Sequence, residues 1–248
     1  MQHLVSPFLS LDRRTIPIYI LGLKEKQNRI DITFKRLIQA GHNQELIQIR
    51  YGIYAKQYPY LLEKLAKKWR ATSFSKGELA CACLHLETLK EVNDPFSMIV
   101  EDDLLLPVKW KELFPHLLST IPQDADIVYL GWSRGQLYLP ELRYDVPYIK
   151  YIPNCCHCYI ISKRAARKIV KNIKKEGISV PIDNWIIGNG QRLGLVIYCA
   201  NPYYQQFKKY LDGDDTINRS RNICRNGIAY QEESLGSSLE QDRRNRIF

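Results

Sequence analysis

The sequence predicts a single α/β domain in which a mixed sheet is flanked by helices, and three observations support this class. Apolar, β-favouring runs alternate with segments whose apolar residues recur at helical spacing. The first three such segments are a strand, a helix and a strand, an order typical of a parallel βαβ unit. The 248 residues are enough to bury a core, and no repeat or linker divides them.

In the first half of the chain, strand and helix patterns follow one another with recognisable end signals. The first helix closes at Gly41, because glycine is common just after a helix C-terminus. Ser75 and Glu78 form a capping box, in which the two side chains satisfy free N–H groups at a helix start. The strands expected here are 16–21, 46–50 and 96–100, and the helices are 25–40, 60–69, 75–90 and 109–118.

The second half continues the pattern but contains one segment without periodicity. A strand at 126–131 ends in a glycine turn at Gly131. We expect residues 132–154 to be a long loop or small hairpin that forms part of a binding site. The domain is expected to cover 1–230, followed at 231–248 by a polar, basic tail that we expect to be flexible. The remaining strands are expected at 156–161 and 195–200, and the remaining helices at 162–175 and 183–193.

The run from Cys155 to Cys158 contains three cysteines and a histidine and so raises the question of zinc. Neighbouring strand residues point to opposite faces, which keeps the four side chains from converging on one ion. Buried thiols of a core strand are therefore the favoured interpretation. Seven cysteines without framework spacing indicate a reducing compartment, and neither a signal peptide nor a membrane span is recognised, so we expect a cytoplasmic protein.

The net charge of +10 favours anionic partners: nucleotide phosphates, nucleic acid or an anionic membrane surface. Charge alone does not choose among them. Much of the basic character lies on the expected helix 162–175, which also has one apolar stripe. Such a helix is usually a solvated face, and it also allows a peripheral membrane contact.

Three acidic residues, Glu101, Asp102 and Asp103, follow the apolar strand 96–100 directly. Three carboxylates at the edge of a core repel one another and lose water, so their placement is costly unless a cation is close. A hard divalent ion with oxygen ligands meets that need, and ligands of open α/β sheets collect at the carboxyl ends of strands. The alternative is a solvated acidic turn.

Seven short segments of the sequence follow one another in a characteristic order: 16–29, 77–85, 101–103, 129–131, 159–166, 181–183 and 214–215. This ordered set resembles glycosyltransferase family 25, the lipooligosaccharide and procollagen galactosyltransferase group. The resemblance covers about residues 16–220 and rests on the ordered set rather than on any one motif. Leu84, Ala80 and Asp214 depart from the residues that the family has at those positions.

The resemblance implies a GT-A fold, in which a Rossmann-like half binds a sugar nucleotide. It implies an inverting, metal-dependent glycosyltransferase that uses Mn²⁺ or Mg²⁺ and moves a hexose, galactose or glucose, from a UDP-sugar. The acceptor would be a hydroxyl of a glycan, a lipid-linked glycan or a protein.

Eight residues are candidates for that chemistry. Asp103 and Asp215 are the expected metal ligands, since carboxylates suit a hard ion that neutralises a diphosphate leaving group. Inversion needs a base on the acceptor hydroxyl; Asp183 is the first candidate and Glu78 the reserve. The expected donor-binding residues are Arg29, Glu101, Asp102 and His85, although His85 could equally orient a loop from inside.

Two other functions are compatible with the same residues. The acidic triplet and the positive charge also suit a metal-dependent nuclease or phosphohydrolase acting on nucleic acid. However, the sequence has no Asp/Glu-x-Lys after the triplet and no His-rich cluster, so nucleic acid is disfavoured as a partner. The other alternative is a catalytically inactive glycosyltransferase-like binding protein.

Overall fold

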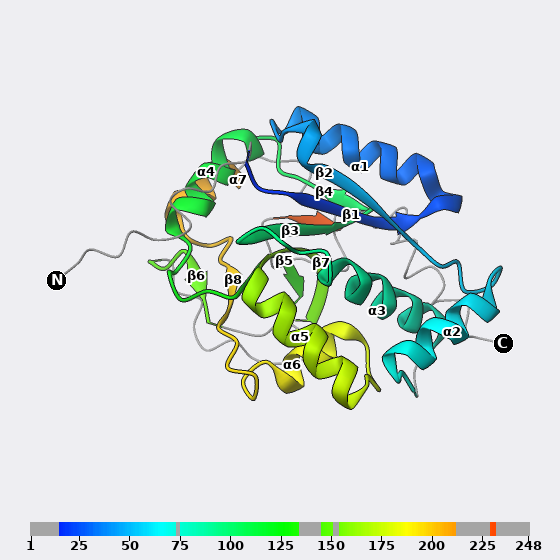
Figure 1. Ribbon diagram of the computed structural model, residues 1–248. Helices are drawn as coiled ribbons and strands as arrows, with labels where there is room; N and C mark the ends of the chain where they lie inside the picture. Colours follow the sequence, from blue (N-terminus) through cyan, green and yellow to red (C-terminus); the bar gives the residue numbers. More distant parts are fainter. Residues whose placement is uncertain (1–14, 73–74, 134–144, 151–153, 212–228, 232–248) are drawn as a thin grey trace.

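The computed structural model describes residues 15–72, 75–133, 145–150, 154–211 and 229–231. Its centre is a seven-stranded sheet with the strand order β2-β1-β3-β7-β5-β8-β6 (Figure 1). Strands β1, β2, β3, β5 and β8 are parallel, whereas β7 and β6 run antiparallel to their neighbours. The predicted α/β class with a mixed sheet is therefore confirmed. The strands are β1 (Ile18–Leu23), β2 (Ile47–Gly52), β3 (Phe96–Glu101), β5 (Ile127–Ser133), β6 (Tyr148–Ile149), β7 (Asn154–Ser162) and β8 (Ile197–Ala200).

Helices cover both faces of the sheet, and each layer packs on its own apolar cluster. On one face, α1, α4 and α7 enclose a cluster with β1, β3 and β8. On the other face, α3, α5 and α6 enclose a second cluster, joined by Trp69 at the end of α2 (Figure 1). The helices are α1 (Gln27–Gln39), α2 (Pro59–Trp69), α3 (Lys76–Leu89), α4 (Trp110–Thr120), α5 (Lys163–Glu176), α6 (Ile182–Asn189) and α7 (Gln205–Leu211).

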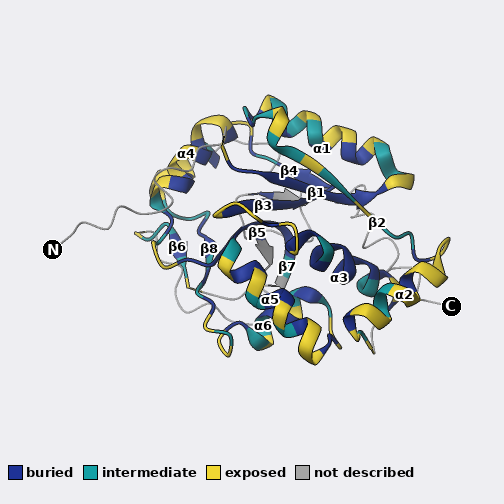
Figure 2. Ribbon diagram, in the orientation of Figure 1, coloured by how far each residue is buried: buried dark blue, intermediate teal, exposed yellow. Residues whose placement is uncertain are grey.

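The burial of each element follows from its sequence pattern. Every residue of the central strands β1 and β3 is buried, as expected for continuous apolar runs covered on both faces. Helices α1 and α5 each bury one apolar stripe against the sheet and expose the opposite, polar face to solvent (Figure 2). The Ser162 hydroxyl starts α5 by accepting a hydrogen bond from the N–H of Ala165 at 3.1 Å.

The structure corrects the glycine turn predicted at Gly131, because β5 continues through this residue to Ser133. A Cβ atom on Gly131 would lie 2.0 Å from Nε2 of His157 and 2.7 Å from the carbonyl oxygen of Ala229. Glycine is therefore needed at this position for close packing and not for a chain reversal. The strand pairing is irregular here, with register shifts on both sides of Gly131.

Short elements outside the predicted set complete the fold. Strand β4 (Leu104–Leu105) pairs antiparallel with β9 (Tyr230–Gln231), so the chain returns from residue 229 onward to the segment just after the acidic triplet. Helix α7 was also not predicted. Of the segment 132–154, the structure describes the last two residues of β5, residues 145–150 with β6, and the first residue of β7. The expected tail beyond Gln231 lies outside the described residues. None of the described helices has the length and apolar character needed to cross a membrane.

Candidate functional site

One edge of the sheet gathers most of the residues singled out in the sequence. Strands β1, β3 and β5 all end at this edge, because β3 is parallel to β1 and both β3 and β5 are antiparallel to β7. Strand β7 begins there at Asn154, which pairs with Ser133 at the end of β5. Ligands of open α/β sheets bind at such an edge.

The acidic triplet at the end of β3 is buried. Glu101 is 7% exposed, Asp102 is 2% exposed and Asp103 is 1% exposed. This contradicts the solvated-turn alternative. Carboxylates with so little access to water need cationic or hydrogen-bonding partners, and the structure provides different partners on the two sides of the strand end.

Asp102 and Asp103 face α1, where Arg29 lies in the first turns of the helix. Nη2 of Arg29 is 3.3 Å from Oδ1 of Asp102 and 3.4 Å from Oδ2 of Asp103. The hydroxyl of Thr33 donates to the carbonyl oxygen of Asp102 at 2.8 Å, and Nη1 of Arg36 donates to the carbonyl oxygen of Leu104 at 3.0 Å. Helix α1 therefore provides a positive charge beside the two carboxylates and holds the backbone of this turn through two hydrogen bonds.

Glu101 faces the opposite layer, toward α3. Its Oε1 atom is 3.6 Å from Nε2 of His85, a fully buried residue. Nδ1 of His85 lies 3.0 Å from the hydroxyl of Tyr159 on β7. The thiol of Cys81, one helical turn before His85, completes a group whose ligand atoms all lie within 4.8 Å of one another. His85 is thus held from inside the core.

Asp183 occupies the first turn of α6 at the same edge and is half-buried. Its Oδ2 accepts the N–H of Cys155 at 3.2 Å, and its Oδ1 accepts the N–H of Asn184 at 2.8 Å. Burial, followed by the charges of Asp183, Cys81 and Glu101, holds the pKa of the Cys156 thiol well above its usual value. The carboxylates of Asp183 and Glu101 therefore both lie close enough to Cys156 to raise the pKa of its thiol.

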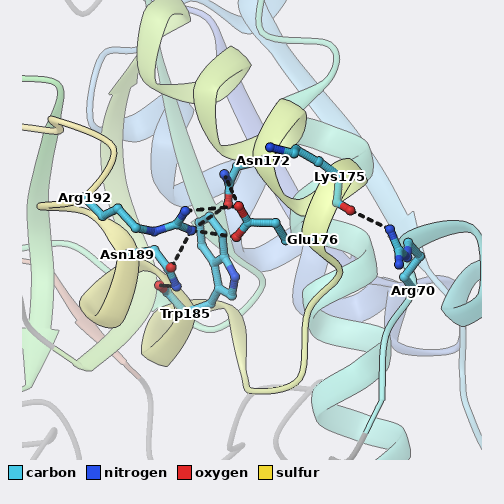
Figure 3. Close-up of polar contacts among 7 residues, drawn as sticks. All are labelled: Arg70, Asn172, Lys175, Glu176, Trp185, Asn189 and Arg192. Carbon is cyan, nitrogen blue, oxygen red and sulfur yellow. Dashed lines mark hydrogen bonds and ion pairs between the residues drawn. The ribbon is translucent and has the colours of Figure 1, made fainter.

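Helix α6 is anchored to α5 by a polar cluster around Arg192, in the turn after α6 (Figure 3). Nη2 of Arg192 is 2.7 Å from Oε2 of Glu176 at the end of α5 and 2.8 Å from Oδ1 of Asn189 at the end of α6. On the other side of α5, Arg70 donates to the carbonyl oxygen of Lys175 (Figure 3). The contacts of Arg192 hold the end of α6, the helix that carries Asp183, against α5.

Glu78 has a structural role in the helix cap. Its Oε2 accepts the N–H of Ser75 at 2.9 Å and the Ser75 hydroxyl at 2.6 Å, and Ser75 accepts the N–H of Glu78 in return. The predicted capping box is therefore confirmed. Asp215, the second expected metal ligand, lies outside the described residues.

His157 is a buried residue of this edge that the sequence did not single out as functional. Its Nε2 atom is 3.2 Å from the carbonyl oxygen of Ala229. Burial lowers the pKa of His157, but contact with Cys155 and the charge of Asp103 outweigh this and raise it overall. Nothing local in the sequence indicates this neighbour, because Ala229 arrives from a distant segment. The thiols of Cys156 and Cys158 are buried, as predicted.

The residues around Asp102 and Asp103 fit a hard divalent cation. Two adjacent carboxylates offer oxygen ligands, and Mg²⁺ and Mn²⁺ prefer such ligands. Arg29 supplies positive charge to one side of the pair, which offsets the repulsion between the two neighbouring carboxylates. The same arginine is suited to contact a phosphate group.

A mixed α/β sheet with buried carboxylates at the end of a central strand defines the class of α/β proteins whose ligands bind at that edge of the sheet. Comparison with known proteins identifies the family. The model of glycosyltransferase family 25, described as an LPS biosynthesis protein, matches residues 15–143, just over half of the chain. The chain therefore belongs to glycosyltransferase family 25, as the motifs predicted.

Two individual proteins are also similar to this chain. Procollagen galactosyltransferase 1-A of Xenopus laevis is 24% identical over 186 residues, which cover 68% of this chain. The chain spans only 30% of the length of that relative. The crystal structure of mouse xyloside xylosyltransferase 1 in its apo form aligns with a TM-score of 0.41 at 10% identity, over 89% of this chain and 98% of that one.

Proposed function

We propose that this protein is an inverting, metal-dependent glycosyltransferase that moves a hexose from a UDP-sugar to an acceptor hydroxyl. The observation that carries the proposal is the buried Asp102–Asp103 pair beside Arg29 at the ligand-binding edge of the sheet. Membership of family 25 supports the same reaction class. The name of the frog relative favours galactose as the sugar and a protein as the acceptor.

The residues would divide the work by their chemistry. Asp103, with Asp215, would hold Mn²⁺ or Mg²⁺, which when bound neutralises the charge on a diphosphate leaving group. Arg29 and Asp102 would orient the diphosphate and donor sugar, because a guanidinium binds phosphate through paired N–H groups. Glu101 and His85 would not contact the donor directly. Their contact inside the core would hold the end of β3 against α3.

Asp183 is our proposed base. In inversion, an acceptor oxygen forms a bond to the anomeric carbon from the face opposite the departing UDP, and the hydroxyl proton must be taken up. Asp183 is half-buried at the correct edge and is oriented by two backbone N–H groups. Glu78 is less suited, because both its contacts with Ser75 serve the helix cap.

A basic groove supports a peripheral contact with an anionic membrane. It lies between the end of α3 and helix α5, has a volume of about 680 Å³, and has Leu89, Val92 and Val170 among its lining residues. Its cationic lining residues are Lys90, Arg167, Lys171, Lys174 and Lys175. Sedimentation with phosphatidylserine vesicles should deplete the wild type and not a Lys171→Glu/Lys174→Glu variant. Equal depletion of both proteins would contradict this assignment.

One experiment tests the main proposal against the nuclease alternative. Thermal shift and donor hydrolysis are measured for the wild type with a panel of UDP- and GDP-sugars, with and without Mn²⁺. Metal-dependent stabilisation by a UDP-sugar supports the proposal, since ligands stabilise the state that they bind. No response to any donor, together with salt-sensitive binding and cleavage of DNA or RNA, would overturn it.

A further inference from the structure

We propose that Cys81, His85 and Glu101 form a second cation site, of the kind that binds Zn²⁺, which is chemically distinct from the hard-ion site at Asp103. The three side chains lie on the α3 side of the strand end, whereas Asp102 and Asp103 face Arg29 on α1. Of the three, His85 and Glu101 were donor-binding candidates from the sequence, whereas Cys81 was part of the matching segment 77–85 and had no role assigned to it.

The geometry suits one ion. Cys81 and His85 are four residues apart on α3, so their side chains lie on one face of the helix. Glu101 reaches the same point from the end of β3, and the three ligand atoms lie within 4.8 Å of one another. Zinc bond lengths of about 2.0–2.3 Å place tetrahedral ligand atoms roughly 3.2–3.7 Å apart. The 3.6 Å between Nε2 of His85 and Oε1 of Glu101 already matches this separation.

His85 provides an independent indication of a ligand. The residue is 0% exposed, yet its Nε2 atom has no hydrogen-bond partner within the part of the chain that the structure describes. This atom points toward the carboxylate of Glu101 at a separation too long for a hydrogen bond. A buried polar atom without a partner is costly, and a cation between the imidazole and the carboxylate removes that cost.

Tyr159 supplies the outer contact that metal-binding histidines usually have. Its hydroxyl is 3.0 Å from Nδ1 of His85, and the two rings stack with their centroids 5.9 Å apart. When Nδ1 carries the proton and donates to this hydroxyl, the lone pair of Nε2 is directed at the site. Tyr159 is therefore a positioning residue for the proposed ligand.

The mixture of ligand types selects the metal. A thiolate, an imidazole and a carboxylate together suit Zn²⁺, whereas Mg²⁺ and Mn²⁺ prefer oxygen ligands only. The fourth position would be taken by water or by the thiol of Cys156, whose charge environment includes both Cys81 and Glu101. A zinc ion here would tie α3 to the last residue of β3 and so hold the acidic triplet in place.

Metal binding itself is the test. Wild-type protein purified without chelator should contain about one zinc per chain, and Co²⁺ added to the apo protein should give a thiolate-to-cobalt absorption band. Cys81→Ser and His85→Gln should each lose the band and the zinc-induced thermal shift. Cys83→Ser, which removes a buried thiol two residues along the same helix, should keep both. Tyr159→Phe should weaken zinc binding by about 10–100-fold.

A second readout avoids variants altogether. In the wild type, zinc should protect Cys81 from alkylation by iodoacetamide, as mapped by mass spectrometry, while Mg²⁺ should not. Absence of zinc, of the cobalt band and of protection in the wild type would overturn the proposal and leave only the direct contact between His85 and Glu101. The Mn²⁺-dependent response to UDP-sugars is measured separately, so either proposal can fail without the other.

Discussion

The Nη2 atom of Arg29 lies 3.3 Å from the Oδ1 atom of Asp102, and both side chains are almost completely buried. The same nitrogen is 3.4 Å from Oδ2 of Asp103. A single guanidinium from α1 therefore neutralises part of the charge that two consecutive carboxylates bring to the end of β3. This ion pair is the structural basis of the proposed donor site.

Removing Arg29 should destabilise the protein strongly. Arg29→Ala leaves two buried carboxylates without this cation, and breaking a buried ion pair costs about 3–5 kcal/mol. The free energy of unfolding in urea measures the effect. Lys35→Ala, on the exposed face of the same helix, is the matched control and should be close to neutral. Equal stabilities of the two variants would show that Arg29 does not hold the triplet.

Replacing Asp183 should affect turnover rather than stability. Asp183→Asn keeps an oxygen for the N–H of Cys155 but cannot take up a proton, so kcat should fall by about 10²–10⁴-fold with little change in KM for the donor. Steady-state kinetics measure this with any UDP-sugar that the wild type uses. Asn184→Ala, at the adjacent exposed position, is the control. Full activity of Asp183→Asn would exclude it as the base.

Glu78 should prove to be a capping residue. Glutamine also serves at this position of a capping box, so Glu78→Gln should leave both stability and kcat near the wild-type values. Ser75→Ala should lower the free energy of unfolding by about 1 kcal/mol, because it removes the N-cap oxygen. A large fall in kcat for Glu78→Gln would instead make Glu78 the base and displace Asp183.

Glu87, in the last turn of α3, should give a pH-dependent contribution to stability. Partial burial raises its pKa, but hydrogen bonds from Lys68 and Lys90 at 2.6 and 2.5 Å outweigh this and lower it overall. A lowered folded-state pKa gives stability that is present above the unfolded pKa of about 4.3 and lost as the pH falls through the folded-state value.

The comparison of wild type with Glu87→Gln tests this sign. The difference in free energy of unfolding should be constant between pH 5 and 7 and should shrink below about pH 4. We expect a difference of less than about 1 kcal/mol, since Glu87 is only partly buried and solvent screens its ion pairs. A difference that grows as the pH falls would contradict the assigned direction.

The layered fold was predictable because its signals are local. The apolar run 96–100 marks a fully buried strand, and the Ser75–Glu78 pair marks the start of a helix within one residue of the observed one. The acidic triplet follows that strand directly, so its position at the carboxyl end of the strand could be predicted. Its burial could not, because a solvated acidic turn was also compatible with the sequence.

Other features depend on contacts between distant segments and have no local signal. Strands β4 and β9 have two residues each, too few to show any periodicity, and they pair residues 104–105 with residues 230–231. Gly131 resembled a turn residue because the sequence does not reveal that the His157 ring packs against it. The sequence also does not reveal that Asp102 and Asp103 face α1 while Glu101 faces α3. The four-residue spacing of Cys81 and His85 on a predicted helix was a usable signal that these two side chains share one face.

Calorimetric titration of UDP into the wild type and into Asp103→Asn, each with Mn²⁺ and with Mg²⁺ or EDTA in its place, tests the central claim most directly. We expect the wild type to bind UDP only with a divalent ion, and Asp103→Asn to lose that binding while unfolding at a similar temperature. Metal-independent binding, or unchanged metal-dependent binding by a folded Asp103→Asn protein, would contradict the assignment of Asp103 to the metal of the donor site.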